Sequence, residues 1–364
     1  MRSLLINWVY FRPVGHVVEA LRLAAGFAAA DPELEISLLL NAESPLELAE
    51  CVPEIAHVYA ADVRQAIPGD LPRDWDYVFT DPRAATGRES RDLDRFHEAF
   101  RKWVHAKAVN RGWDVETLPA RAVTPLHLRL PDAVRRRAAE LLPDISAPRL
   151  SVLPAAGSQM RTPSLEFWSA LFAEFFDRHG DGEIVLLGSF DQSRSFTRGI
   201  TREDVRTLTR RFPHVHDAFD AGLLQQLAMA ERCRLHISPH SGMSFAVQAV
   251  GVPWLALAAQ QWYEYLLNGV PLVSVFPDCP LYPCYREMYD DCAERIRRGV
   301  RTPCIEDAAL LAKLPAIVSS MEALLAGSIN YRDAALAHEA ALAKLLGPES
   351  IVDWPEVVAD GYLF

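Results

Sequence analysis

Short apolar runs alternate with longer amphipathic stretches along most of the chain. Most of the short runs are continuously apolar, which is typical of parallel strands buried on both faces. The longer stretches repeat their apolar positions every three or four residues and therefore predict helices. The predicted strands are Leu4–Asn7, Ile36–Leu40, Tyr77–Phe79, Ser151–Pro154, Ile184–Leu187, Leu235–Ser238, Trp254–Leu257 and Val273–Phe276. The predicted helices are Val17–Ala30, Asp92–Asn110, Ala133–Leu142, Pro163–Arg178, Leu223–Glu231 and Ser244–Val250.

This alternation predicts an α/β fold made of two Rossmann-like domains. The strand-helix pattern restarts after the proline-containing stretch Pro143–Pro148, so we expect a first domain over 1–148 and a second over 149–330. A helical segment over 331–364 is expected to pack back toward the first domain. If the two domains face each other, the carboxyl ends of their strands should line a cleft between them.

The composition narrows the class of partner. The chain has 364 residues, of which 50% are hydrophobic, and a formal net charge of −11. An acidic protein has no general attraction for nucleic acid or for an anionic membrane. No apolar run is long enough to span a bilayer, and the first apolar run lacks the features of a signal peptide. We therefore expect a cytoplasmic protein without disulfides, whose oligomeric state the sequence leaves open.

The first candidate for chemistry is the pair Gly15-His16, between the first predicted strand and the first predicted helix. Gly15 allows a tight turn, and His16 then lies at the amino end of the helix. The positive end of a helix favours a neutral imidazole, which is the form that a general base needs. Glu19 lies one turn further along and is the rival candidate for this role. The alternative is that His16 merely caps the helix.

A second candidate site follows the predicted strand Ser151–Pro154. Ser158 lies in a Gly-Ser turn, and Arg161 precedes Thr162 and Pro163, which are expected to cap and begin the next helix. A hydroxyl, an arginine and a helix start together can bind a phosphate group. An ordinary capped strand-helix connection is the alternative.

A third candidate is the loop from Ser238 to Ser244, which ends the strand Leu235–Ser238 and begins a helix of small residues. Ser241 and Ser244 offer hydroxyl groups, and Gly242 allows a ligand to approach the backbone N–H groups closely. A pyrophosphate fits such a helix start by charge and by geometry. A simple serine cap on a packed helix is the alternative.

The fourth candidate is a group of cysteines within the segment 277–305, an insertion of the second domain. Four of the six cysteines fall here, and the segment is rich in proline and poor in core-forming residues. Four thiolates suit a structural zinc or iron ion, although the spacing lacks the close pairs of a zinc knuckle. Four unrelated thiols are the alternative. The four cysteines are Cys279, Cys284, Cys292 and Cys304.

Taken in order, these segments resemble glycosyltransferase family 9, the ADP-heptose:lipopolysaccharide heptosyltransferases. The resemblance lies in LPAAGSQMRTPSLEFWSALFAEF, in EIVLLGSFDQS, in AGLLQQLAMAERCRLHIS and in PHSGMSFAVQAVGVPWLAL. It covers residues 149–305 well and the first domain loosely. Some members of the family also have a cysteine-rich insertion after the last strands. The resemblance implies a GT-B fold, a nucleotide-sugar donor, with an ADP-sugar as the first expectation, and an acceptor that carries a hydroxyl group.

The resemblance also implies roles for individual residues. Arg161 matches a basic residue that pairs with the donor phosphate, with Ser158 beside it. Asp191 matches an acidic residue that binds the donor ribose. The loop that surrounds the pyrophosphate would contain Ser241, Gly242, Met243 and Ser244. The chain departs from the family at two positions, because His240 and His16 stand where the family has aspartate.

These residues predict an inverting glycosyltransferase that acts without a metal at the phosphates. His16 would remove the acceptor proton, while Arg161 and the helix start at Ser241 would stabilise the departing diphosphate. No cofactor is expected for the chemistry. The alternatives are a nucleotide-sugar-binding protein with a degenerate site, which the two substitutions favour, and a sugar epimerase of similar shape, which lacks the expected motifs.

Overall fold

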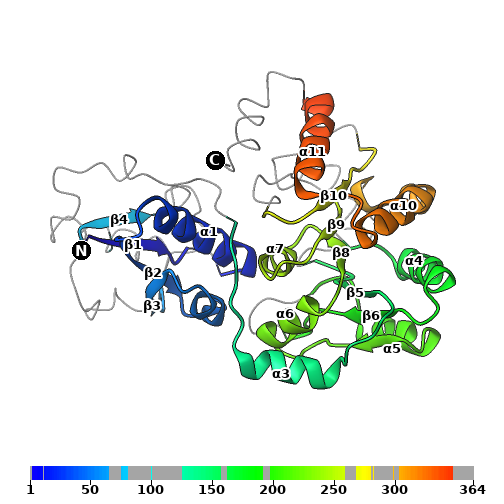
Figure 1. Cartoon of the computed structure of the whole chain (residues 1–364), viewed down its shortest axis with the longest axis horizontal. Coiled ribbons are helices and arrows are strands. Elements are labelled where there is room, and N and C mark those ends of the chain that lie inside the picture. The colour runs from blue at the N-terminus through cyan, green and yellow to red at the C-terminus, as the bar shows by residue number, and fades with distance from the viewer. Residues whose placement is uncertain are drawn as a thin grey trace. The chain divides into compact units, whose positions relative to one another are not determined.

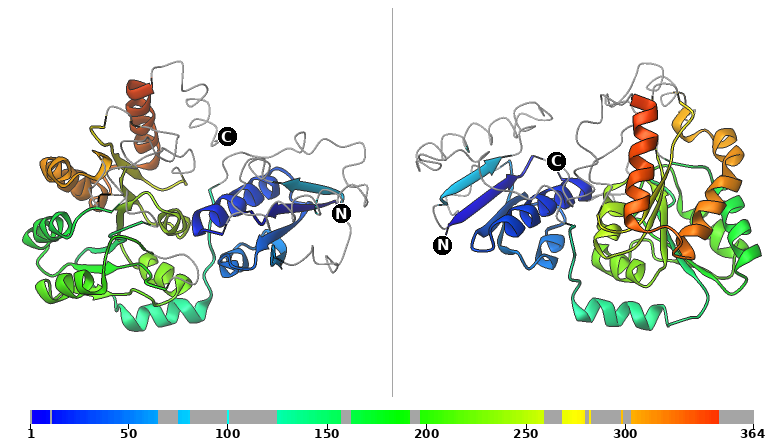
Figure 2. Two further views of the ribbon diagram at one scale, coloured as in Figure 1. Left: turned by 180° about the vertical axis from the view of Figure 1, so that it is seen from behind. Right: turned by 45° about the horizontal axis from the view of Figure 1, so that its top comes forward.

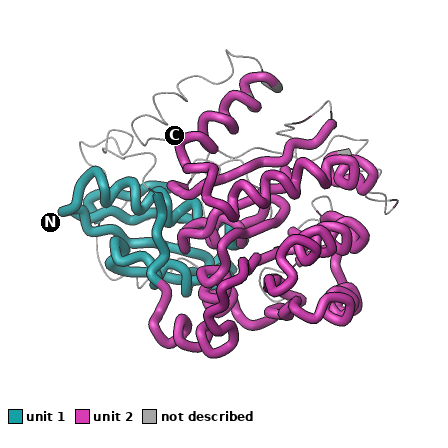
Figure 3. Tube along the Cα trace, turned by 45° about the vertical axis from the view of Figure 1, so that its right-hand side comes forward, with its two compact units in different colours: residues 1–129, 362–364 teal, residues 130–361 magenta. Residues whose placement is uncertain are grey.

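The computed structural model describes residues 2–10, 12–64, 75–80, 100, 125–156, 162–191, 197–258, 268–279, 282, 298 and 303–346. Contacts within the chain divide it into two compact units, of which the first covers Met1–Arg129 and the second begins at Leu130 (Figure 3). Both units are parallel α/β structures, as the sequence predicts. No helix among the described residues combines the length and the apolar character that crossing a bilayer requires.

The first unit contains a four-stranded parallel sheet in the order β3-β2-β1-β4 (Figure 1). The central strand β1 is buried at all six positions, which explains its unbroken apolar sequence. Helix α1 packs against β1 and β2. The elements are β1 (Ser3–Trp8), α1 (Val14–Ala30), β2 (Glu35–Asn41), the 3-10 helix η1 (Leu46–Cys51), β3 (Ile55–Ala61) and β4 (Tyr77–Thr80).

The second unit contains a six-stranded parallel sheet in the order β10-β9-β8-β5-β6-β7. Its five strand pairs are all parallel, and the residues of β5 lie opposite those of β6 on one side and of β8 on the other. The strands are β5 (Arg149–Val152), β6 (Glu183–Leu186), β7 (Val215–Asp217), β8 (Leu235–Pro239), β9 (Trp254–Leu257) and β10 (Leu272–Val275).

Helices cover both faces of this sheet, with α4 and α10 on one face and α6 and α7 on the other (Figures 1 and 2). The core on the α4 side is rich in aromatic residues, because Phe167, Phe172 and Phe175 are all buried against the strands. The helices are α3 (Asp132–Leu141), α4 (Leu165–Arg178), α5 (Arg202–Arg211), α6 (Leu223–Glu231), α7 (Gly242–Ala249), η6 (Pro303–Ile305), α9 (Asp307–Ala312), α10 (Leu314–Leu325) and α11 (Tyr331–Leu346).

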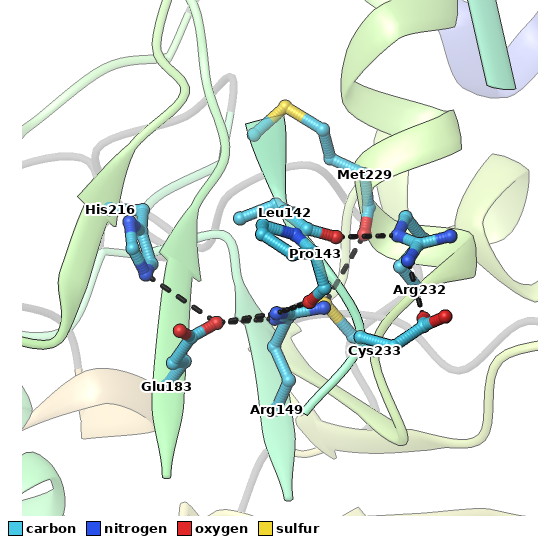
Figure 4. Close-up of polar contacts among 9 residues, drawn as sticks. Leu142, Pro143, Arg149, Glu183, His216, Met229, Arg232 and Cys233 are labelled. Atoms are coloured by element: carbon cyan, nitrogen blue, oxygen red, sulfur yellow. Dashed lines mark hydrogen bonds and ion pairs between the residues drawn. The ribbon is translucent and has the colours of Figure 1, made fainter. Parts of the chain in front are cut away.

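A largely buried ion pair joins the amino-terminal ends of β5 and β6 (Figure 4). Arg149 begins β5 and donates from Nε to Glu183 Oε2 at 2.6 Å, where Glu183 begins β6. A second guanidinium nitrogen of Arg149 donates to the carbonyl of Pro143 at 2.7 Å. Nearby, burial raises the pKa of the Cys233 thiol to about 12, so this cysteine is an inert core residue.

Further polar contacts attach the chain just before the proline-containing stretch, including α3, to the second unit. Arg232 donates to the carbonyl of Leu142 at 2.8 Å, and Arg135 of α3 forms a two-bond ion pair with Glu231 of α6. The division by contacts therefore falls between Arg129 and Leu130, ahead of α3, whereas the sequence pattern predicts a domain limit near residue 148. Pro143 follows the end of α3, and the polar contacts on either side of it hold α3 against α6 of the second unit.

Some element limits differ from those predicted. Helix α4 begins at Leu165, where Ser164 accepts a hydrogen bond from Phe167 N at 3.1 Å and acts as the cap. Thr162, the expected cap, instead donates to the carbonyl of Arg198 at 2.8 Å. The predicted helix Asp92–Asn110 lies outside the described residues, apart from Phe100. Helix α11 contacts β10, and the predicted packing of 331–364 toward the first domain stays a prediction.

The histidine on α11 should make the second unit sensitive to acid. His338 is 4% exposed and stacks on Phe276, and burial lowers its pKa to about 4. Unfolded histidine binds a proton near pH 6.5, so the stability associated with neutral His338 is complete above that pH and is lost as pH falls toward 4. The full loss amounts to about 3 kcal/mol.

We therefore expect urea midpoints to fall less between pH 7 and pH 4 in His338→Phe than in the wild type. Phenylalanine retains the stack on Phe276 and has no proton to bind. Equal pH dependence in the two proteins would contradict this assignment, even if the variant is less stable at pH 7.

Candidate functional site

The order of strands in the second sheet defines where a ligand is expected. The chain runs from β5 outward through β6 to β7, and then crosses to the other side of β5 and continues through β8, β9 and β10. The direction of the crossovers therefore reverses between β5 and β8. Doubly wound sheets bind their ligands at such a switch point, outside the carboxyl ends of the strands.

The loop after β8 combines a buried and an accessible part. His240 and Ser241 are buried, whereas Gly242 and Met243, the first two residues of α7, are partly exposed. Ser241 caps α7, because its Oγ accepts from Ser244 N at 3.2 Å. The backbone N–H groups of Gly242 and Met243 belong to the first turn and have no acceptor within the helix. This arrangement suits an anion at the start of α7.

Below this loop lies a chain of buried polar side chains. His236, on β8, is completely buried, with Nδ1 3.0 Å from Ser151 Oγ of β5 and Nε2 3.1 Å from Ser244 Oγ of α7. Ser244 Oγ is also 2.6 Å from Ser238 Oγ and 2.8 Å from Ser241 Oγ. Burial lowers the pKa of His236 to about 3, so its ring is neutral under all ordinary conditions.

Trp254 of β9 completes this cluster. Its indole Nε1 donates to Ser238 Oγ at 2.8 Å, and the ring of His240 lies edge-on to the Trp254 ring with centroids 5.7 Å apart. Hence β5, β8, β9 and α7 all contribute a polar group to one buried cluster.

The loop after β5 begins at the other side of the switch point. Its first residues are buried, and the indole Nε1 of Trp168 on α4 donates to the carbonyl of Pro154 at 2.8 Å. Ser158 and Arg161, the expected phosphate-binding residues, lie outside the described residues. Their roles stay predictions.

The loop after β6 is held by Asp220. The Asp220 carboxylate accepts from Phe190 N at 2.7 Å, from Ser189 Oγ at 3.0 Å and from Arg202 at 2.9 Å. Burial acts to raise the pKa of Asp220, but these hydrogen bonds outweigh it and the pKa lies below its usual value. Asp191 is exposed in the same loop, and its N–H donates to Ser189 Oγ at 3.1 Å.

Two aromatic rings stand beside this carboxylate. The rings of Phe190 and Phe219 are stacked with centroids 4.6 Å apart, and the Arg202 guanidinium lies 4.5 Å from the Phe190 centroid. Both rings are only partly buried. They therefore present part of their apolar surface near the carboxyl ends of β6 and β7.

In the first unit, His16 is the third residue of α1 and lies near its amino end, as expected. Its Nδ1 is 3.3 Å from Glu19 Oε2, and both side chains are partly exposed. A carboxylate that accepts from Nδ1 leaves the lone pair of a neutral ring on Nε2. Glu19 thus orients His16 as a third group orients a catalytic base. Gly15, expected in a turn, is the second residue of α1.

The described cysteines, Cys51, Cys233, Cys279 and Cys304, form no disulfide with one another. Cys279 and Cys304 both pack against the core of the second unit, whereas Cys284 and Cys292 lie outside the described residues. Within the described part of the chain, no three side chains of His, Cys, Asp or Glu gather as metal ligands would. The metal site stays a prediction.

The structure reveals residues that sequence reasoning missed, namely His236, Trp254 and Asp220, and it places Ser238, the first residue of the third candidate loop, in the same buried cluster as His236 and Trp254. Each is a single polar or aromatic position next to an apolar run, which a sequence pattern does not distinguish from an ordinary core or turn residue. The sequence signal for His236 and Ser238 was that polar residues occupy two alternate positions of the otherwise apolar strand LHISP.

Comparison with known proteins supports the expected fold. No family model and no curated protein matches the sequence. A glycosyltransferase family 9 structure from Veillonella parvula DSM 2008 matches with a TM-score of 0.56 and 12% identity, over 88% of this chain and 98% of the other. The E. coli ADP-heptose LPS heptosyltransferase II matches with a TM-score of 0.53 and 14% identity, over 88% of this chain and all (100%) of the other. The chain therefore has the two-domain fold of these glycosyltransferases, and the predicted resemblance is confirmed at the level of the fold.

A glycine after β6 allows the aromatic pair to form. Gly188 has a φ of +154°, and a Cβ atom there would come within 2.4 Å of the Phe219 ring. We expect Gly188→Ala to displace Phe219 and to lower the free energy of unfolding by about 1–3 kcal/mol, through overpacking and backbone strain.

Gly180→Ala is the matched control, since a Cβ atom at Gly180 would meet nothing within 4 Å. Denaturant unfolding of the two variants tests the comparison. A Gly188→Ala protein as stable as Gly180→Ala would show that the ring and loop adapt without cost.

Proposed function

We propose that the protein is a glycosyltransferase that transfers a sugar from a nucleoside-diphosphate sugar to a hydroxyl group of an acceptor. The observation that carries this proposal is the switch point of the second sheet. The three segments expected to bind the donor follow β8, β5 and β6, which are adjacent strands, so they emerge at one edge of the sheet. The fold shared with the two solved glycosyltransferases supports the same conclusion.

Each part of the donor has a candidate partner at this edge. The N–H groups of Gly242 and Met243 would bind the diphosphate, together with Arg161 and Ser158 from the loop after β5. Asp191 would bind the ribose. The stacked pair of Phe190 and Phe219 offers a surface for the base. An ADP-sugar is the first donor to test, beginning with an ADP-heptose, because heptosyltransferase II is named for ADP-heptose.

The proposed reaction is a direct displacement with inversion at the anomeric carbon. His16 Nε2 takes the proton of the acceptor hydroxyl, the acceptor oxygen bonds to the anomeric carbon, and the bond from that carbon to the diphosphate oxygen breaks. The diphosphate leaves with the bonding electron pair. The start of α7 and Arg161 provide positive charge for it, so the residues present supply stabilisation without a metal at the phosphates.

A second candidate is a nucleotide-sugar-binding protein that does not catalyse transfer. The observation that favours it is the buried histidine at position 240, where the resemblance implies aspartate. Release of nucleoside diphosphate separates the two functions. A transferase should release it slowly to water from a matching nucleotide sugar and faster with an acceptor, whereas a binding protein should bind the donor and leave it intact.

The His16–Glu19 pair predicts graded losses of turnover. His16→Ala should lower kcat by about a hundredfold to ten-thousandfold, the usual effect of removing a positioned base. Glu19→Gln should lower kcat by about tenfold only, because the amide oxygen still accepts from Nδ1. The Kd of the donor should change in neither variant. Steady-state rates of diphosphate release and donor titrations provide these values.

Glu33→Gln is the control, an exposed carboxylate elsewhere in the first unit whose change should leave kcat unaltered. If Glu19→Gln abolishes turnover and His16→Ala retains it, Glu19 is the base. If both retain it, the base lies elsewhere.

We also propose that the four cysteines of 277–305 bind one structural zinc or iron ion. Cys279 and Cys304 lie against the same core, so the segment between them begins and ends at that core. Protein purified without chelator should contain about one metal ion per chain. Cys284→Ser should lose it and be less stable, whereas Cys51→Ser, a buried thiol of the first unit, should retain it. A metal-free wild-type protein would refute the site.

A further inference from the structure

The directions of the hydrogen bonds are constrained in the buried serine cluster below the start of α7. Ser244 Oγ lies within hydrogen-bond distance of His236 Nε2, Ser238 Oγ and Ser241 Oγ, at 3.1, 2.6 and 2.8 Å. A hydroxyl group has one proton and two lone pairs. Ser244 therefore donates in one of these three contacts and accepts in the other two.

The contacts of Trp254 and Ser151 limit the directions of these hydrogen bonds further. The indole N–H of Trp254 is a donor only, so Ser238 Oγ accepts from it and sends its own proton to Pro239 O, at 2.9 Å, or to Ser244. At the other end, the contact between Ser151 Oγ and His236 Nδ1 fits either tautomer of the ring, and in one of them the Ser151 hydroxyl donates to Nδ1. A neutral ring that accepts at Nδ1 carries its proton on Nε2 and donates it to Ser244.

With this tautomer, two arrangements satisfy the whole cluster. In the first, Ser241 donates to Ser244, Ser244 to Ser238, and Ser238 to Pro239 O. In the second, Ser238 donates to Ser244, Ser244 donates to Ser241, and the Ser241 proton is directed away from the cluster. The second arrangement is favoured when an anion lies next to Ser241, because the Ser241 hydroxyl then has a charged acceptor.

We propose that His236 is a positioning residue of the donor site: its Nε2–H donates to Ser244, which lets Ser244 donate to Ser241 and turns the Ser241 hydroxyl toward a phosphate group of the donor. The inference rests on the proposed function, because it assumes that a nucleoside diphosphate binds at the start of α7. It assigns a role in phosphate binding to a residue that touches no ligand.

The surroundings of His236 fit this role. The ring is completely buried, and the low pKa that results keeps it neutral and limited to one N–H group. His236 therefore directs hydroxyl groups without adding charge. Its two partners come from β5 and α7, so the ring also fixes the start of α7 relative to both strands that flank the switch point.

A purely structural His236 and a positioning His236 predict different binding results. Loss of a structural residue lowers stability and weakens all ligands of the folded site alike. Loss of a positioning residue weakens ligands that carry the diphosphate and leaves the corresponding nucleosides unaffected. The comparison of ADP with adenosine, of UDP with uridine and of GDP with guanosine separates the two.

The experiment is calorimetric titration of the full chain with these three pairs. In His236→Phe, the diphosphate that the wild type prefers should bind about tenfold or more weakly, and its nucleoside should bind unchanged. His236→Gln should restore most of the affinity, because the amide can accept from Ser151 and donate to Ser244. His338→Phe removes another buried imidazole of the same unit and should change neither affinity.

Ser244→Ala provides a second test if His236→Phe does not fold. This substitution removes the hydroxyl that links His236 to Ser241 but keeps the His236 ring. The same selective loss of diphosphate affinity is therefore expected. If the wild type binds a diphosphate and either variant binds it equally well, the positioning role is wrong and the proposed function stands. If the wild type binds none of the three diphosphates, the proposed function fails, and this inference fails with it.

Discussion

The burial of the His236 imidazole ring constrains how β5, β8 and α7 are arranged in the second unit. His236 has no access to water, so each of its nitrogens needs a protein partner, since an unpaired buried polar group costs about 1–3 kcal/mol. The partners are Ser151 on β5 and Ser244 on α7. Satisfying the ring therefore sets the distance between a central strand and the helix whose amino end faces the predicted donor site.

The two edges of the same sheet use polar groups differently. At the amino-terminal edge, Arg149 and Glu183 form a buried pair that begins β5 and β6 and leaves the guanidinium bonded to Pro143 as well. Both charges of this pair are matched by protein groups, so the pair is structural. At the carboxyl-terminal edge, Gly242 and Met243 present backbone donors with no acceptor inside the helix. This difference between the two edges follows from the parallel strands. Each crossover leaves a strand at its carboxyl end, so the amino ends of the helices gather at that edge.

The sequence predicted the central strands and two of the outer strands, β4 and β10, but it missed the outer strands β3 and β7. Strands β1, β5, β6, β8 and β9 are buried on both faces, so their runs of apolar residues are unambiguous. Strand β3 was missed because several of its residues are exposed, and β7 because it has only three residues. The resemblance supplied the fold and the α7 loop. It did not supply the His236 cluster or the Glu19 contact, because both depend on which residues of separate elements meet in space.

The histidine at position 240 shows how the site can depart from the resemblance and still suit a diphosphate. A carboxylate at this position would place a negative charge next to the start of α7, where it would compete with a phosphate group for the same backbone donors. His240 is instead completely buried and packs edge-on to Trp254. In a chain with a net charge of −11, a side chain without a carboxylate here leaves the positive end of α7 available to an anion.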